Sequence, residues 1–153
     1  MLDKFKSLLG KSKKLPDVLS KEEEQKILEK GSQRQKEELA ARRDARPEVL
    51  YFLAEDASEE VRKVIASNPA TPPQADAILK DDQSEDVRTE LARKIGRLVP
   101  GLEKGEREAL REKAISILEV LAADQLPRIR AVVAQEIKAS DAVPKAIVDQ
   151  LAR

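Results

Sequence analysis

Apolar residues recur at helical spacing along most of the chain, in short runs separated by polar segments. In one such run Val61, Val64 and Ile65 stand three and four residues apart, with charged residues around them. This spacing is typical of a helix that buries one face. The pattern predicts helices over residues 21–30, 32–43, 47–54, 73–80 and 106–123, helices that begin just after Ser58 and Ser84 and near Pro127, and a last one within 143–153.

Residues that favour the first turn of a helix stand where these predicted helices begin. Pro47 and Pro73 occupy equivalent positions, and a missing N–H and a preset backbone angle suit proline to a first helical turn. Ser58 and Ser84 are expected N-caps, and acidic residues follow each of them, where the helix dipole favours negative charge. Ser20 opens an S-x-x-E sequence, which predicts a capping box.

One stretch of sequence occurs three times. LAEDASEEVRKVIA, at residues 53–66, returns 26 residues later as LKDDQSEDVRTELA, at residues 79–92. A third copy, LAADQLPRIRAVVA, follows at residues 121–134, a further 42 residues along. Shifting the first copy back by 26 residues gives a weaker match, and terminal units of a repeat array are expected to be atypical. The chain is therefore built from internal repeats.

The repeat predicts an all-α protein, a right-handed α-solenoid of about nine or ten short helices in one domain. Residues 1–15 form a basic amphipathic N-terminal segment, and residues 16–153 form the helical-repeat domain. Its expected units are a degenerate one at 20–45, two well-formed ones at 47–71 and 72–98, a longer one at 103–139 and a partial one at 141–153. Gly96, Pro100, Gly101 and Gly105 predict a break in the chain before the longer helix.

The repeat also predicts the core. In the longer helix, one stripe contains Leu110, Ala114, Ile117, Leu118 and Leu121. The residues expected to be buried in the array are Leu50, Leu53, Val61, Ile65, Ile78, Leu79, Val87, Leu91, Ile117, Leu121, Ile129, Val133 and Ile137. A repeat unit cannot bury its apolar face alone. The partial unit therefore predicts that the chain is the N-terminal part of a longer protein, or that a partner covers this end.

Aspartate and arginine recur six residues apart in all three copies, as Asp56 and Arg62, Asp82 and Arg88, and Asp124 and Arg130. The aspartate falls in the turn between helices, where its carboxylate can accept backbone N–H groups, and the arginine can bridge to the aspartate of its own or the adjacent unit. We interpret the six residues as a structural ladder that fixes the angle between stacked units. A row of arginines for phosphate or acidic partners is the weaker alternative, because each arginine comes with its own carboxylate.

The pattern L-A-x-D-x-x-x-x-V-R-x-x-I/L-A-x-x-P resembles that of HEAT-type helical repeats, in which a turn aspartate and a second-helix arginine recur at this separation. The short period, with N-P and P-P linkers, more closely resembles the leucine-rich-repeat variant and an uncharacterised bacterial family of HEAT-like proteins. The resemblance covers residues 47–134, and more faintly 20–153. It implies an α-solenoid that makes protein–protein contacts, and it supplies no catalytic residues.

The composition argues against catalysis. The chain has no Cys and no His, which excludes a thiolate nucleophile, a histidine base and an ordinary zinc site. Neighbouring carboxylates, at 22–24 and at 81–82, are interpreted as solvated capping charges. We expect no enzyme activity, no cofactor and no metal. Apolar runs fall short of the ~20 residues of a spanning helix, and residues 1–15 lack the apolar stretch of a signal peptide, so we expect a soluble, cytoplasmic protein.

Positive charge is concentrated at the N-terminus. Residues 1–15 hold five Lys against one Asp, a net +4, which leaves −4 for residues 16–153 because the chain is neutral overall. One interpretation is a short helix for a membrane surface or an acidic partner. The favoured one is a chain end whose few apolar residues cap the first repeat, because one short helix would bind lipid weakly.

These observations lead to a function without catalysis. We expect a protein–protein interaction or scaffold module whose partner is another protein or the rest of its own longer chain. Its candidate binding face lies on the second helices and comprises Lys63, Ser67, Thr89, Arg93 and Gln135. The alternative is nucleic-acid binding through that face and the basic N-terminal segment. It is disfavoured, because a body with net −4 and the aromatics Tyr51 and Phe52 lacks an evident basic, stacking surface.

Overall fold

The structure, a computed structural model, describes residues 14–102, 107–137 and 143–153. Within these ranges the chain is helical and contains no strand, which confirms the all-α class. The helices are α2 (Lys21–Lys30), α3 (Gln33–Ala40), α4 (Pro47–Leu53), α5 (Glu59–Ser67), α6 (Pro73–Leu79), α7 (Glu85–Leu98), α8 (Glu108–Ala122), α9 (Pro127–Ile137) and α10 (Lys145–Leu151), with a 3-10 turn, η1 (Val99–Gly101), after α7. Most of the basic segment predicted at 1–15, and parts of the units at 103–139 and 141–153, lie outside the described residues.

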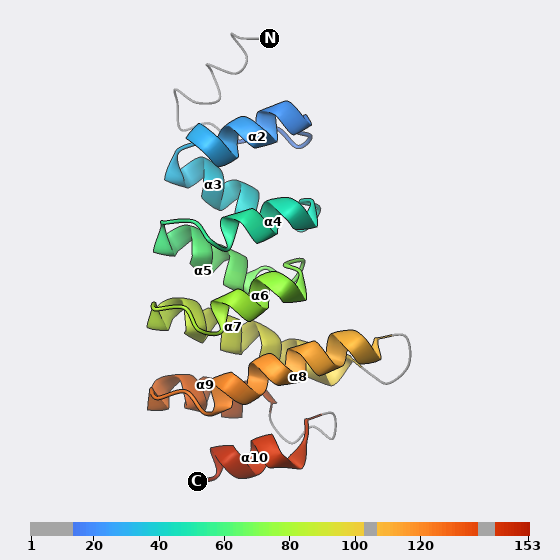
Figure 1. Cartoon of the computed structure of the whole chain (residues 1–153), viewed down its shortest axis with the longest axis vertical. Coiled ribbons are helices and arrows are strands. Elements are labelled where there is room, and N and C mark those ends of the chain that lie inside the picture. Colours follow the sequence, from blue (N-terminus) through green and yellow to red (C-terminus); the bar gives the residue numbers. More distant parts are fainter. Residues whose placement is uncertain (1–13, 103–106, 138–142) are drawn as a thin grey trace.

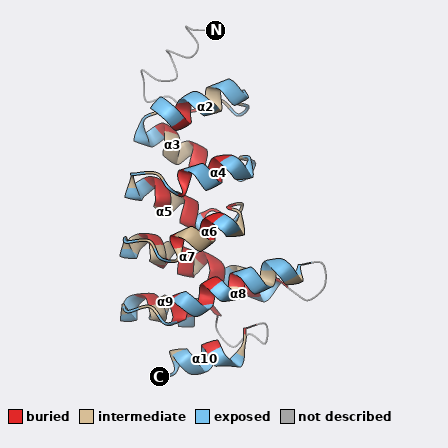
Figure 2. Ribbon diagram, viewed as in Figure 1, coloured by how far each residue is buried: buried red, intermediate tan, exposed pale blue. Residues whose placement is uncertain are grey.

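The helices follow one another along the long axis of the molecule (Figure 1). Each even-numbered helix from α2 to α8 contacts the next even-numbered one, and each odd-numbered helix from α3 to α7 contacts the next odd-numbered one. We call α2, α4, α6, α8 and α10 the first-helix column and α3, α5, α7 and α9 the second-helix column. Buried residues lie mainly where the two columns face each other (Figure 2).

Serine side chains cap the starts of four helices. Ser58 and Ser84 accept hydrogen bonds from the backbone N–H groups of Val61 and Val87, as the sequence predicted. Ser20 likewise accepts from the N–H of its third following residue. The complete capping box forms one helix later, between Ser32 and residue 35. These side chains satisfy donors that the first helical turn leaves without backbone partners.

The core follows the predicted stripes with three exceptions. Val64 of the stripe on α5 is half-buried, and of the residues expected to be buried in the array all are buried except Ile78. Helix α6 buries Ala75, Asp76 and Leu79, and Ile78 is half-buried. In α8 the predicted stripe begins too early, because Leu110 is 40% exposed in the first turns of the helix.

Two element boundaries also differ from the prediction. Helix α3 ends at Ala40 rather than at Arg43, and the Asn68 side chain donates to the carbonyls of Ala40 and Arg42 at this end. The predicted break begins later than Gly96, since α7 continues through that residue to Leu98 before the 3-10 turn η1. The glycine serves a close approach of α7 to α9: a Cβ added there would lie 2.7 Å from the Cβ of Glu136.

Candidate interaction surfaces

The predicted ladder residues come together between adjacent units of the second-helix column. Arg62 on α5 donates to the carboxylate of Asp82 through Nε at 2.8 Å and Nη2 at 3.2 Å. Its Nη1 donates to the carbonyls of Asp56 and Ala57 in its own turn, at 2.8 and 3.1 Å. Asp82 in turn accepts the N–H of Ser84 at 2.9 Å. Of the two pairings that the sequence left open, the arginine reaches the aspartate of the following unit.

The same arrangement recurs above and below this contact. Arg88 donates to Asp124 at 2.8 and 3.4 Å and to the carbonyl of Asp82 at 2.7 Å. In the first unit Lys36 takes the place of the arginine and donates to Asp56 at 3.0 Å. Sequence reasoning did not single out Lys36, although the 26-residue shift that aligns the units places it on Arg62. The ladder thus consists of three ion pairs, Lys36–Asp56, Arg62–Asp82 and Arg88–Asp124, and each pair joins consecutive units.

Arg130 has half of this arrangement. Its Nη1 donates to the carbonyls of Asp124 and Gln125 at 2.6 and 3.1 Å. Arg62 binds two carbonyls of its own turn in the same way, and Arg88 binds one. Among the described residues, however, no carboxylate lies within ion-pair distance of its guanidinium group. The ladder of the described chain therefore ends on an arginine.

A second buried polar network links the same units, and sequence reasoning missed it. The Asn68 side chain donates to the carbonyls of Ala40 and Arg42, at 2.8 and 3.0 Å. Lys94, which is 26 residues further on, donates to the carbonyls of Ile65 and Asn68 at 3.4 and 3.1 Å. Each side chain thus satisfies carbonyls at the C-terminal end of the preceding second helix, groups that a helix leaves without partners.

Lys94 is neutralised by Asp76. The Lys94 Nζ lies 2.6 Å from Asp76 Oδ1, and the two side chains are 4% and 5% exposed. Burial raises the pKa of Asp76 to about 6 despite this contact, and burial also lowers the pKa of Lys94. The sequence contains a signal that could have revealed this pair. The 26-residue alignment matches Asp76 with Leu50 and Lys94 with Asn68, so an acidic and a basic residue replace two uncharged ones in the same unit.

The predicted binding face lies on α5, α7 and α9 and is only partly accessible. Ser67 and Gln135 are exposed, while Lys63 and Arg93 are half-buried. Thr89 is a wrong assignment, because its side chain is buried. The Thr89 hydroxyl donates to the carbonyl of Glu85 on its own helix. Arg128 on α9 lies over this face of α7, with its Nη2 3.5 Å from the Thr89 hydroxyl.

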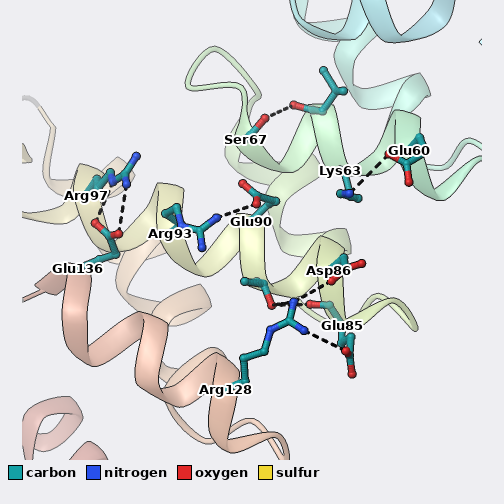
Figure 3. A network of polar contacts seen from close by, with 12 residues as sticks. Glu60, Lys63, Ser67, Glu85, Asp86, Glu90, Arg93, Arg97, Arg128 and Glu136 are labelled. Carbon is teal, nitrogen blue, oxygen red and sulfur yellow. Dashed lines mark hydrogen bonds and ion pairs between the residues drawn. The ribbon is translucent and has the colours of Figure 1, made fainter. Parts of the chain in front are cut away.

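The cations of this face are paired with carboxylates (Figure 3). Four cationic side chains and five carboxylates form these pairs: Lys63 with Glu60, Arg93 with Glu90, Arg97 with Glu136, and Arg128 with Glu85 and Asp86. Such exposed pairs contribute little to stability. They do cancel the positive potential that a polyanion would need, so the face presents alternating charges rather than a basic patch.

Exposed apolar side chains instead mark the first-helix column. Tyr51 and Phe52 on α4 are 42% and 53% exposed, although the chain has few aromatic residues. Phe52 aligns with Ile78 on α6, at an offset of 26, and with Val120 on α8. Ile78 is half-buried, and Val120 is 37% exposed. We call Tyr51, Phe52, Ile78 and Val120 the apolar row.

The longer helices α7 and α8 also enclose a cavity with α6. Its volume is about 390 Å³, and its walls are mainly apolar, including Ile95, Leu98, Leu110 and Ile117. Asp76 lies in its lining, next to the pair that it forms with Lys94. The half-exposed Leu110 is therefore accounted for as part of the cavity wall.

Comparison with known proteins finds no matching family model, no matching curated protein and no matching solved structure. In the described ranges, no group of three or more carboxylates is placed to hold a metal ion. None of the helices described is long and apolar enough to cross a membrane.

Proposed function

We propose that this protein is a non-catalytic protein–protein interaction or scaffold module, built from HEAT-like repeats stacked as a right-handed α-solenoid. Two regular columns of helices support this assignment. The three ladder contacts, which join consecutive units through equivalent side chains, support it further. Repeat stacks keep their stability in the core and leave their surfaces free for contacts, which makes binding the expected role of such a fold.

One observation carries the choice of surface: the described aromatic residues are exposed. Phe and Tyr side chains bury 150–250 Å² when they are covered, and aromatic residues are enriched in the energetic centres of interfaces. Tyr51 and Phe52 leave 42% and 53% of their surfaces exposed, and Val120 on α8 leaves 37% exposed, so each has apolar area that a partner could cover. We therefore place the partner on the apolar row of the first-helix column, rather than on the second-helix face that the sequence favoured.

Nucleic-acid binding remains the second candidate, and it has less support. It would use the second-helix face, where the four cations named above are each within ion-pair distance of a carboxylate. A polyanion would have to displace those carboxylates, because its own affinity depends on unpaired positive charge.

The test compares matched variants of the two surfaces in a pull-down with the full chain as bait. The variant Y51S/F52S changes the apolar row, and K63S/Q135S changes the second-helix face. We expect K63S/Q135S to change the free energy of unfolding by less than about 0.5 kcal/mol. Y51S/F52S should cost more, because the covered halves of both rings are lost, so both variants are compared at a temperature at which circular dichroism shows them fully folded. A specific partner should be retained by K63S/Q135S and lost by Y51S/F52S.

The opposite pattern, with the partner lost only from K63S/Q135S, would return the binding site to the second-helix face. A gel-shift titration with duplex DNA tests the second candidate on the same samples. Affinity at micromolar protein that falls steeply with salt would favour nucleic-acid binding over the proposed function.

A further inference from the structure

The end of the second-helix column carries a surface that is covered in every earlier unit. Repeat alignment matches Ala40 on α3, Ala66 on α5, Ala92 on α7 and Ala134 on α9. The first three are completely buried. Ala134 is exposed. Helices α3, α5 and α7 each contact the next helix of the second-helix column. Among the described helices, α9 contacts α10 of the first-helix column but is followed by no further second-column helix.

Arg130 lies on the same helix, one turn before Ala134, and its guanidinium group is preoriented. Its Nη1 is held by turn carbonyls, at 2.6 and 3.1 Å, as the Nη1 atoms of Arg62 and Arg88 are held in their own turns. In those two arginines the remaining Nε and Nη2 donors bind an aspartate of the next unit. In Arg130 these donors face no carboxylate of the described chain. The arginine fork has a geometry that binds carboxylates in a bidentate way.

The charge of this surface indicates what covers it. A second copy packed α9 against α9 would bring Arg130 against its own counterpart, which is unfavourable. The three ladder aspartates are already occupied by Lys36, Arg62 and Arg88, so none of them is free to serve another copy. An occupant that completes the ladder at Arg130 brings a carboxylate, as Asp82 and Asp124 do in the earlier contacts, and a helix that covers Ala134.

We propose that the α9 surface around Arg130 and Ala134 binds a helix of a partner protein, and that an aspartate in the turn before this helix pairs with Arg130. The partner helix continues the second-helix column, with its aspartate two residues before a Ser or Thr N-cap, as Asp82 precedes Ser84. This inference rests on the proposed function, because it specifies the chemistry of one partner contact.

The test uses the full chain, labelled with ¹⁵N, and a synthetic peptide with the sequence of residues 79–98. This peptide contains the turn aspartate, the serine cap and the helix that pack on Arg62 within the protein. NMR titration detects binding even at millimolar Kd. We expect saturable shifts of the Arg130 Nε–H signal and of the amides from 131 to 135. The matched control peptide carries Asp82→Asn, which removes the charge and keeps the shape, and it should bind about tenfold or more weakly.

A second measurement guards against weak helix formation in the free peptide. The sequence of residues 56–71 is appended after Arg153, because Leu151 and Ala152 align with Leu53 and Ala54 and the first appended aspartate then takes the ladder position. We expect the appended aspartate to raise the folded-to-unfolded ratio about tenfold over an appended asparagine, and this gain to vanish in an Arg130→Gln background.

Equal effects of aspartate and asparagine in both measurements would overturn the inference, and so would peptide shifts that fall on the apolar row instead of α9. Neither result changes the interpretation of the pull-down with Y51S/F52S, which tests the apolar row. Conversely, a pull-down that contradicts the proposed function does not alter the NMR titration, which tests the α9 surface.

Discussion

Removing the carboxylate of Asp82 is the sharpest test of the ladder. Its side chain is 9% exposed, and that of its partner Arg62 is 10% exposed. The carboxylate accepts two bonds from the guanidinium group and one from the N–H of Ser84. Asp82→Ala would therefore leave a nearly buried arginine without its counter-charge and would remove a bond at the start of α7.

The magnitude follows from these contacts. Removing one partner of a buried ion pair costs about 3–5 kcal/mol when the remaining charge has no other partner. Arg62 keeps its bonds to two carbonyls, so we expect the lower end, about 3 kcal/mol of unfolding free energy. Asp124→Ala should cost about 2 kcal/mol, because the second bond from Arg88 is 3.4 Å long and that arginine is more exposed. Asp56→Ala should cost about 1 kcal/mol, since Lys36 makes one bond and is 21% exposed.

Urea denaturation followed by circular dichroism measures the three values. Asp81→Ala is the matched control: it removes the neighbouring carboxylate, which is 71% exposed and paired with Lys80, and should change stability by less than about 0.5 kcal/mol. A double-mutant cycle with Arg62→Met should show that Asp82 and Arg62 are coupled. If Asp82→Ala unfolds like Asp81→Ala, or if the three aspartates do not follow the stated order, the ladder is not what joins the units.

Two further predictions concern α7, namely the buried pair of Lys94 with Asp76 and the close approach of Gly96 to Glu136. Burial raises the pKa of Asp76 from 3.8 to about 6, so between these pH values the folded chain holds a proton that the unfolded chain has lost. This site should therefore lower stability by about 2 kcal/mol as pH rises from 4 to 6. A carboxyl ¹³C titration midpoint below 4 would show that Lys94 outweighs burial. Gly96→Ala should destabilise the chain by about 1–2 kcal/mol despite better helix propensity, because the added Cβ would lie 2.7 Å from that of Glu136. Urea denaturation measures this cost, and the control Gly101→Ala, where a Cβ meets nothing within 4 Å, should be close to neutral in the same assay.

By itself the sequence determined the helices, their caps and most of the core. Those features depend on local spacing and on repetition. Val61 and Val87 are buried because each belongs to an apolar stripe of a helix. Ser58 and Ser84 cap their helices because each directly precedes the first helical turn. The six-residue spacing of the ladder was equally visible in the sequence. The spacing alone did not say which aspartate each arginine meets, because both choices lie within reach of the side chain.

Only the tertiary structure decided the contacts between units. Arg62 turns to Asp82 rather than to Asp56 because the carbonyls of its own turn occupy Nη1 and orient the fork toward the next unit. Thr89 falls on a helix face that is polar by pattern, yet it is buried, because an arginine of α9 lies over it. A single helix's periodicity records which side faces its own core, but it does not record which neighbouring helix covers the remaining sides. That depends on how consecutive units stack.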